Sequence, residues 1–171
     1  ISDISNNNSD NNDIMIDISS NNNKEFVILY FSASWCEPCN ILTPKLITWY
    51  KKYQQQREKI KSLPNLDVIW ISGEDKEQEY LNYLKKMPWP GLPYNSPYSW
   101  FLNCKYNITR YPSLFVVRVA DQQVVAKLED LNDFFQPQDN LEIIDLLDLL
   151  IQWRDFRCDG DCLENTNPEV I

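Results

Sequence analysis

The sequence predicts a single α/β domain built on a central mixed β-sheet. Short apolar runs that suit buried strands alternate with longer segments in which apolar residues recur at helical spacing. Two β-branched runs near residue 120 are separated by a short polar turn, which predicts an antiparallel hairpin. The 171 residues are enough to bury one hydrophobic core, and none of the apolar runs reaches the roughly 18 residues of a membrane-spanning helix.

In the first part of the chain we expect two strands and a long helix. Residues 14–18 suit a short strand, and the continuous apolar run at 26–31 predicts a strand buried on both faces. A helix is expected from Glu37. Its buried face is expected to consist of apolar residues that recur at helical spacing: Ile41, Leu42, Leu46, Trp49, Tyr50 and Tyr53. Pro44 lies inside this helix, where it removes a backbone hydrogen bond and is expected to cause a kink.

The middle of the chain predicts another strand, a helix and a loop. Residues 66–71 suit the strand, and Ser72 is a candidate N-cap for the helix that follows. The acidic residues Glu74, Asp75 and Glu77 suit the first turn of that helix. The buried side of that helix is expected to consist of Tyr80, Leu81 and Leu84. Residues 87–93 contain three prolines and a glycine, which favours a loop over either regular element.

The last third of the chain predicts a short helix, a hairpin and a final helix. The short helix is expected around 98–106, and the strand at 114–119 should pair antiparallel with 124–128. Residues 139–140 are candidate caps of a last helix, whose apolar spacing continues to residue 151.

Both ends of the chain are expected to be tails. Residues 1–13 are Asn, Ser and Asp with little else, too few apolar groups to offset the entropy of ordering. A second tail is expected at 158–171, which leaves 14–157 as the domain. Because the chain starts with Ile1 and not with Met, we expect its native N-terminus to be missing, so a targeting segment would not be visible. A cytoplasmic location is favoured.

Charge and composition narrow the possible functions. The formal net charge of −9 argues against nucleic acid as a partner, since neutralising phosphates requires Lys and Arg. The sequence contains no histidine, which removes Cys-His and Ser-His pairs and imidazole metal ligands. Cysteine is then the strongest candidate nucleophile, and it must be activated by its position in the fold.

Cys36 and Cys39 are the candidate reactive centre. They are separated by two residues and lie where a buried strand gives way to a helix. A sulfur at a helix N-terminus is favoured as the thiolate by unpaired N–H groups and the helix dipole. The second sulfur, one turn further in, would be close enough to attack a mixed disulfide. This placement predicts a redox pair that cycles between dithiol and disulfide.

The motifs around this pair occur in an informative order. They are YFSASWCEPC (30–39), TPKL (43–46), KMPW (86–89), LPY (92–94) and RYPSL (110–114). With them, residues 26–152 resemble the thioredoxin superfamily, and within it the tryparedoxin and nucleoredoxin branch. The resemblance implies a thioredoxin-like fold, a central mixed β-sheet flanked by helices.

The resemblance implies a role for each cysteine of the motif. Cys36 would attack a target disulfide, and Cys39 would resolve the mixed disulfide. Tyr30 stands where thioredoxins carry a buried Asp, so proton transfer to Cys39 must use water or another group. Glu37 stands between the cysteines, where its charge disfavours a thiolate on Cys36 but suits the helix N-terminus.

A substrate groove is implied by four further residues. They are Trp35, Trp89, Tyr111 and Pro112. Pro112 falls in the position of the superfamily's cis-proline and, if cis, would expose the backbone of Tyr111 for strand-like pairing with a substrate. Tyr111 is bulkier than the residue commonly found there and would narrow the groove. The alternatives are that Trp35 is an ordinary packing aromatic and Pro112 an ordinary trans proline.

The predicted function is a thiol–disulfide oxidoreductase that reduces protein disulfides without a bound cofactor. The implied partners are protein disulfides, among them those of thiol peroxidases, and an upstream dithiol or reductase; no membrane partner is evident, and a monomer is expected. One alternative is an oxidase or isomerase of an oxidising compartment, with a reduction potential well above the roughly −270 mV of thioredoxin. Another is a non-catalytic module that binds clients through the groove.

The remaining cysteines allow several interpretations. Cys158 and Cys162 could form a small disulfide, join a relay with the first pair, help to bind a metal, or be two exposed thiols on a tail, which is the simplest interpretation. Cys104 is expected to be a small buried hydrophobic residue. No metal site is predicted.

Overall fold

The computed structural model describes residues 24–127. Its elements in this range are β1 (Phe26–Ser32), α1 (Glu37–Lys59), β2 (Leu66–Ser72), α2 (Glu77–Leu84), α3 (Pro97–Lys105), β3 (Ser113–Arg118) and β4 (Val124–Lys127). The strands form one mixed sheet in the order β2-β1-β3-β4. The predicted strand at 14–18, the helix capped at 139–140 and both tails lie outside the described residues.

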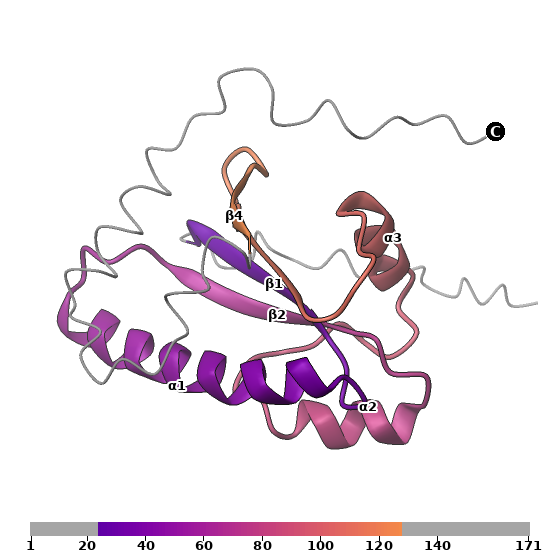
Figure 1. Ribbon diagram of the computed structural model, residues 1–171. Coiled ribbons are helices and arrows are strands. Elements are labelled where there is room, and N and C mark those ends of the chain that lie inside the picture. The colour runs from indigo at the N-terminus through magenta and orange to yellow at the C-terminus, as the bar shows by residue number, and fades with distance from the viewer. Residues whose placement is uncertain (1–23, 128–171) are drawn as a thin grey trace, which may run out of the picture.

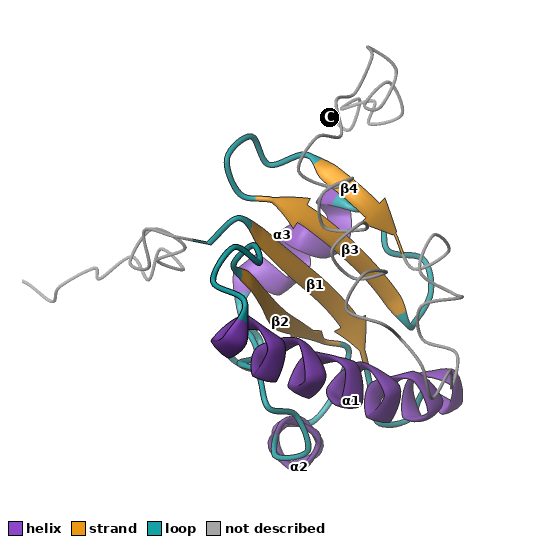
Figure 2. Ribbon diagram, turned by 90° about the vertical axis from the view of Figure 1, so that its left-hand side faces the viewer, coloured by secondary structure: helices purple, strands orange, loops and turns teal. Residues whose placement is uncertain are grey.

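Strand β1 is the centre of the sheet and of the core. It pairs parallel with β2 and antiparallel with β3, and all seven of its residues are buried. Its side chains alternate between the two faces of the sheet, as the period of a strand requires. Tyr30 and its neighbours on one face pack with α1 and α2, whereas Phe31 and its neighbours on the other pack with residues of α3. Figure 2 shows α1 and α2 on one side of the sheet and α3 on the other.

Helix α1 runs along the sheet beneath β1 and β2 (Figure 1). Leu46, Trp49 and Tyr53 are buried as predicted, and Cys39 and Thr43 continue the same buried face. Ile41, also expected on this face, is 61% exposed, because it follows the buried Cys39 by two positions and so lies on the opposite side of the helix. Pro38 lies in the first turn, where the missing N–H costs nothing. The helix also continues through Pro44.

Helix α2 begins later than the sequence predicts. Ser72 is not its N-cap: it is the last residue of β2, and its hydroxyl accepts a hydrogen bond from the backbone N–H of Glu74 at 3.0 Å. The cap position belongs to Lys76, whose side chain makes no capping hydrogen bond. The buried side of α2 also differs from the prediction. Tyr80 and Tyr83 are buried and Leu84 is partly buried, which is the i, i+3, i+4 spacing of one helix face, whereas Leu81 is exposed.

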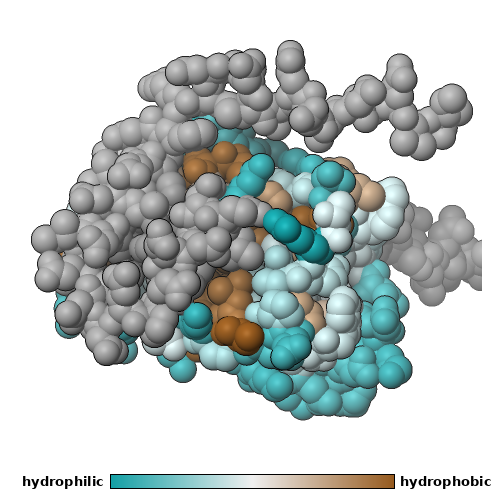
Figure 3. All heavy atoms as spheres, in the orientation of Figure 1, coloured by the Kyte–Doolittle hydropathy of each residue, from teal (hydrophilic) through white to brown (hydrophobic). Residues whose placement is uncertain are grey.

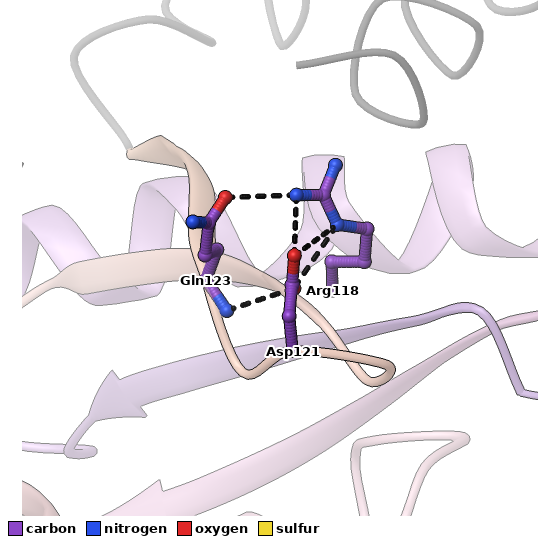
Figure 4. Close-up of polar contacts among 3 residues, drawn as sticks. All are labelled: Arg118, Asp121 and Gln123. Carbon is purple, nitrogen blue, oxygen red and sulfur yellow. Dashed lines mark hydrogen bonds and ion pairs between the residues drawn. The ribbon is translucent and has the colours of Figure 1, made fainter. Parts of the chain in front are cut away.

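The predicted hairpin of β3 and β4 is confirmed, and a polar cluster closes its turn. The guanidinium of Arg118 donates hydrogen bonds to the carboxylate of Asp121 and to Oε1 of Gln123, at 2.6 and 2.8 Å for Nη2 (Figure 4). The carboxylate also accepts the backbone N–H of Gln123 at 3.2 Å. Gln122, at the tip of the turn, has a φ of 59°. These contacts hold the two strands in register at their connected end.

In the view of Figure 3, the hydrophobic residues that are visible form separate groups among hydrophilic ones. None of the helices in the described range is both long and apolar enough to cross a membrane.

The predicted loop at 87–93 is confirmed, and it packs against the outer edge of β2. The backbone N–H of Trp70 donates to the carbonyl of Pro90, and the N–H of Leu92 donates to the carbonyl of Trp70, both at 2.9 Å. Gly91 sits between them, and a Cβ added there would lie 2.8 Å from Cε3 of Trp70. The close approach of this backbone to the indole therefore requires a glycine.

We expect Gly91→Ala to lower the free energy of unfolding by about 1–3 kcal/mol, because the added methyl overpacks the fully buried Trp70 ring. Urea denaturation of the wild type and the variant measures the difference. An unchanged unfolding midpoint would show that the loop can move away from the indole without cost.

Candidate active site

Cys36 and Cys39 lie at the start of α1, as predicted, and form a disulfide with their Cα atoms 5.2 Å apart. Cys36 is the N-cap residue of the helix, and its backbone N–H donates to the carbonyl of Ala33 at 3.2 Å in the turn after β1. Its sulfur accepts the backbone N–H of Cys39 at 3.2 Å. A sulfur in this position lies at the positive end of the helix dipole, which stabilises a thiolate.

The two sulfur-bearing residues differ in their access to solvent. Cys36 is 6% exposed, whereas Cys39 is completely buried. Glu37, between them, is exposed in the first turn of the helix. A partner molecule can therefore reach the pair only through the exposed edge of Cys36.

Glu74 is a residue of this site that the sequence interpretation missed, because it was assigned to the first turn of the next helix. Its side chain accepts hydrogen bonds from the backbone N–H and the hydroxyl of Ser34, the latter at 3.1 Å. It is only 8% exposed. The parallel pairing of β1 and β2 is the feature that could have identified Glu74. Parallel strands end at the same edge of a sheet, so the loops that follow them, with Ser34 and Glu74, lie close together.

Trp35 is held in place although its side chain is 58% exposed. Its indole N–H donates to the carbonyl of Gly73 at 3.0 Å. Its ring centroid lies 5.7 Å from that of Tyr111, with the planes tilted by 60°. The amide of Asn40 donates to the carbonyl of Ser34 at 2.8 Å and fixes the preceding residue. The indole thus presents a fixed face to solvent beside Cys36.

Tyr111 and Pro112 reach the same surface from the loop before β3. The Tyr111–Pro112 peptide bond is cis, and both side chains are half-buried. Burial, together with the negative charge of Asp75, raises the pKa of Tyr111, so its hydroxyl remains protonated at neutral pH. The structure brings the ring of Tyr111 against that of Trp35, the residue before Cys36, and Pro112 follows Tyr111 in the same loop. The part of these three residues in substrate binding stays a prediction.

The structure does not bring Trp89 to this surface. Trp89 is 3% exposed and packs in the core, with its ring centroid 5.5 Å from Tyr50 and 6.4 Å from Tyr30. Its part in substrate binding stays a prediction.

Three buried hydroxyl groups lie behind Cys39. Oγ1 of Thr43 donates to the carbonyl of Cys39 at 2.7 Å. The same oxygen is 2.8 Å from the hydroxyl of Tyr30 and 2.7 Å from that of Tyr83. Because the one proton of Thr43 is used on the carbonyl, both tyrosines donate to its oxygen.

This hydroxyl cluster of Tyr30, Thr43 and Tyr83 is uncharged at neutral pH. Burial raises the pKa of Tyr30 to about 12 and also raises the pKa of Tyr83. The cluster therefore supplies hydrogen bonds beneath Cys39 and, unlike a carboxylate, carries no negative charge. Thr43 and Tyr83 were assigned no role from the sequence, because their contacts join elements about 40 residues apart.

Cys104, the third cysteine of the described residues, is not bonded to this pair. Cys104 is exposed on α3, which corrects the expectation of a buried residue: none of the residues of this helix is buried. Cys158 and Cys162 lie outside the described residues. In residues 24–127, His, Cys, Asp and Glu side chains do not gather in any group of three or more that could hold a metal ion.

Comparisons with known proteins agree on one family. A family model described as thioredoxin-like matches residues 23–124. Tryparedoxin of Trypanosoma brucei brucei is 41% identical over 69 residues, which are 40% of this chain and 43% of that protein. Probable nucleoredoxin 1 of Arabidopsis thaliana is 30% identical over 105 residues, 61% of this chain and 17% of that protein. The chain thus spans less than half the length of either relative.

Solved structures show the same likeness. Native tryparedoxin I from Crithidia fasciculata superposes with a TM-score of 0.57 at 28% identity, and the match covers 68% of this chain and 77% of that one.

We expect Thr43→Val to lower the free energy of unfolding by about 1–3 kcal/mol, because it leaves two tyrosine hydroxyls and the carbonyl of Cys39 without their shared partner. Thr48→Val is the matched control: Thr48 makes the same bond to the carbonyl four residues earlier but is exposed, and its loss should cost less than about 0.5 kcal/mol. Thermal and urea unfolding measure both. Equal losses would mean that the cluster contributes nothing beyond an ordinary helix contact.

Proposed function

Because the chain belongs to the thioredoxin-like family, we propose that it is a thiol–disulfide oxidoreductase that reduces protein disulfides through Cys36 and Cys39. The observation that carries this proposal is the disulfide at the N-terminus of α1, with one sulfur at the surface and the other buried. Tryparedoxin and nucleoredoxins among the relatives support the same chemistry.

The reaction proceeds by two successive thiol–disulfide exchanges. In the reduced protein the Cys36 thiolate attacks one sulfur of the target disulfide, and the other target sulfur leaves as a thiolate that takes up a proton. Cys39 then loses its proton and attacks the sulfur of Cys36, which releases the second target thiol. Two electrons pass to the target, and the protein is left with the Cys36–Cys39 disulfide seen in the structure.

Access and electrostatics assign the order of the two cysteines. Only Cys36 has exposed surface, and its sulfur already accepts an N–H from the first helical turn. The same N–H and the helix dipole stabilise the thiolate that begins the reaction. Cys39 is sealed from solvent and can react only with a sulfur already bonded to Cys36.

The surface formed by Trp35, Tyr111 and Pro112 is proposed to contact the target. Its two aromatic residues are a tryptophan and a tyrosine, residue types that are enriched in protein–protein interfaces. The targets are proposed to be protein disulfides, with thiol peroxidases among them, and an upstream dithiol or reductase restores the reduced pair. A reducing, cytoplasmic setting is proposed as well. A reduction potential near that of thioredoxin would support this direction, and one well above it would identify an oxidase or isomerase.

Replacing the cysteines tests the function. Cys36→Ser should abolish reduction of a protein disulfide, because it removes the attacking sulfur, whereas Cys39→Ser should form mixed disulfides that persist. Loss of insulin disulfides measures the first effect, and non-reducing electrophoresis with mass spectrometry measures the second. Cys104→Ser, which removes an exposed thiol on α3, is the control and should reduce insulin like the wild type. Wild-type activity equal to that of Cys36→Ser would exclude the enzymatic function.

A further inference from the structure

Three loops meet at the edge of the sheet where Cys36 lies. Trp35 follows β1, Gly73 follows β2 and Tyr111 precedes β3. Because β2 is parallel to β1 and β3 is antiparallel, the ends of the strands that carry these loops lie at the same edge. The backbone N–H of Gly73 donates to the carbonyl of Ser32 at 3.0 Å, which ties two of the loops together.

Gly73 is in direct contact with the ring of Tyr111. A Cβ added at Gly73 would lie 2.7 Å from Cζ and 2.9 Å from the hydroxyl oxygen of Tyr111, closer than Cβ atoms approach other groups. Gly73 does not have a positive φ, so its backbone conformation does not require a glycine. The glycine is required because the ring of Tyr111 leaves no space for a Cβ. Any side chain at residue 73 must push the tyrosine ring away.

The same glycine also holds the indole. Its carbonyl accepts the N–H of Trp35 at 3.0 Å, and the ring of Trp35 lies 5.7 Å from that of Tyr111. Gly73 therefore fixes both aromatic side chains. Its carbonyl accepts the hydrogen bond of Trp35, and its lack of a side chain leaves room for the ring of Tyr111. We call Trp35 and Tyr111, fixed in this way, the aromatic wall.

We propose that Gly73 is a specificity-determining residue that assembles the aromatic wall, and that this wall makes Cys36 favour polypeptide disulfides over small ones. The inference rests on the proposed function. A polypeptide that brings its disulfide to Cys36 must lay neighbouring residues against Trp35, which is 58% exposed, whereas a small disulfide needs only the exposed edge of the sulfur. A wall already fixed in the free protein costs no ordering on binding.

The test compares two disulfides in four proteins: the wild type, Gly73→Ala, Tyr111→Ala and the double variant. Each is reduced beforehand, and its second-order rate constants with insulin and with bis(2-hydroxyethyl) disulfide are measured by quenching the reaction and separating oxidised from reduced protein. Each single substitution should lower the ratio of the insulin to the small-disulfide rate constant by about fivefold, the loss expected for one aromatic pair. The double variant should be no worse than Tyr111→Ala, because Gly73 acts through that ring.

Two comparisons separate specificity from damage to the fold. Gly91→Ala strains a glycine that approaches Trp70 in the core and should leave the ratio unchanged. If Gly73→Ala does not fold on its own, the double variant should fold, because the three atoms nearest to the added Cβ all belong to the side chain of Tyr111. A double variant that also fails to fold would overturn the role proposed for Gly73.

Equal losses with both disulfides, or losses that add in the double variant, would overturn the proposal. If the wild type reduced neither disulfide, the proposed function itself would fail, which is a different result from an unchanged ratio.

Discussion

The parallel pairing of β1 with β2 is the constraint on which the rest of the structure depends. It brings the ends of both strands to one edge of the sheet, and the helix that connects them, α1, packs on one face of β1. The turn after β1 then places Cys36 at the start of α1, and the loop after β2 brings Glu74 to Ser34 and the carbonyl of Gly73 to the indole of Trp35. The position of Cys36 and of the residues around it thus follows from one strand pairing.

The two sides of the cysteine pair have different physical character. On the outer side, Trp35 and Tyr111 give an aromatic surface whose positions are fixed before a partner arrives. On the inner side, Cys39 is buried over hydroxyl groups that satisfy one another. Satisfied buried polar groups specify one arrangement of a core, because any other would leave them without partners. The outer side can therefore be shaped for partners without disturbing the packing below.

Local pattern predicted the elements well, and contacts between distant elements account for what it missed. The run at 26–31, the hairpin and the spacing of Cys36 and Cys39 each carry their information in neighbouring residues, and the thioredoxin-like fold they imply is confirmed. The likeness to tryparedoxins and nucleoredoxins is confirmed too. Glu74 was misjudged because acidic residues after a strand also suit a helix start. Leu81 was misjudged because the sequence does not show which of two overlapping helix faces, one with Leu81 and one with Tyr83, packs on the sheet.

The hydroxyl cluster beneath Cys39 has an electrical consequence. With the disulfide formed, burial raises the pKa of Tyr30 to about 12, and no histidine occurs anywhere in the chain to respond to mild acid. The hydroxyl cluster therefore stays uncharged between mild acid and neutral pH. A change of pH in that range leaves the charge beneath Cys39 unaltered, so a titration seen there has to come from groups outside the cluster.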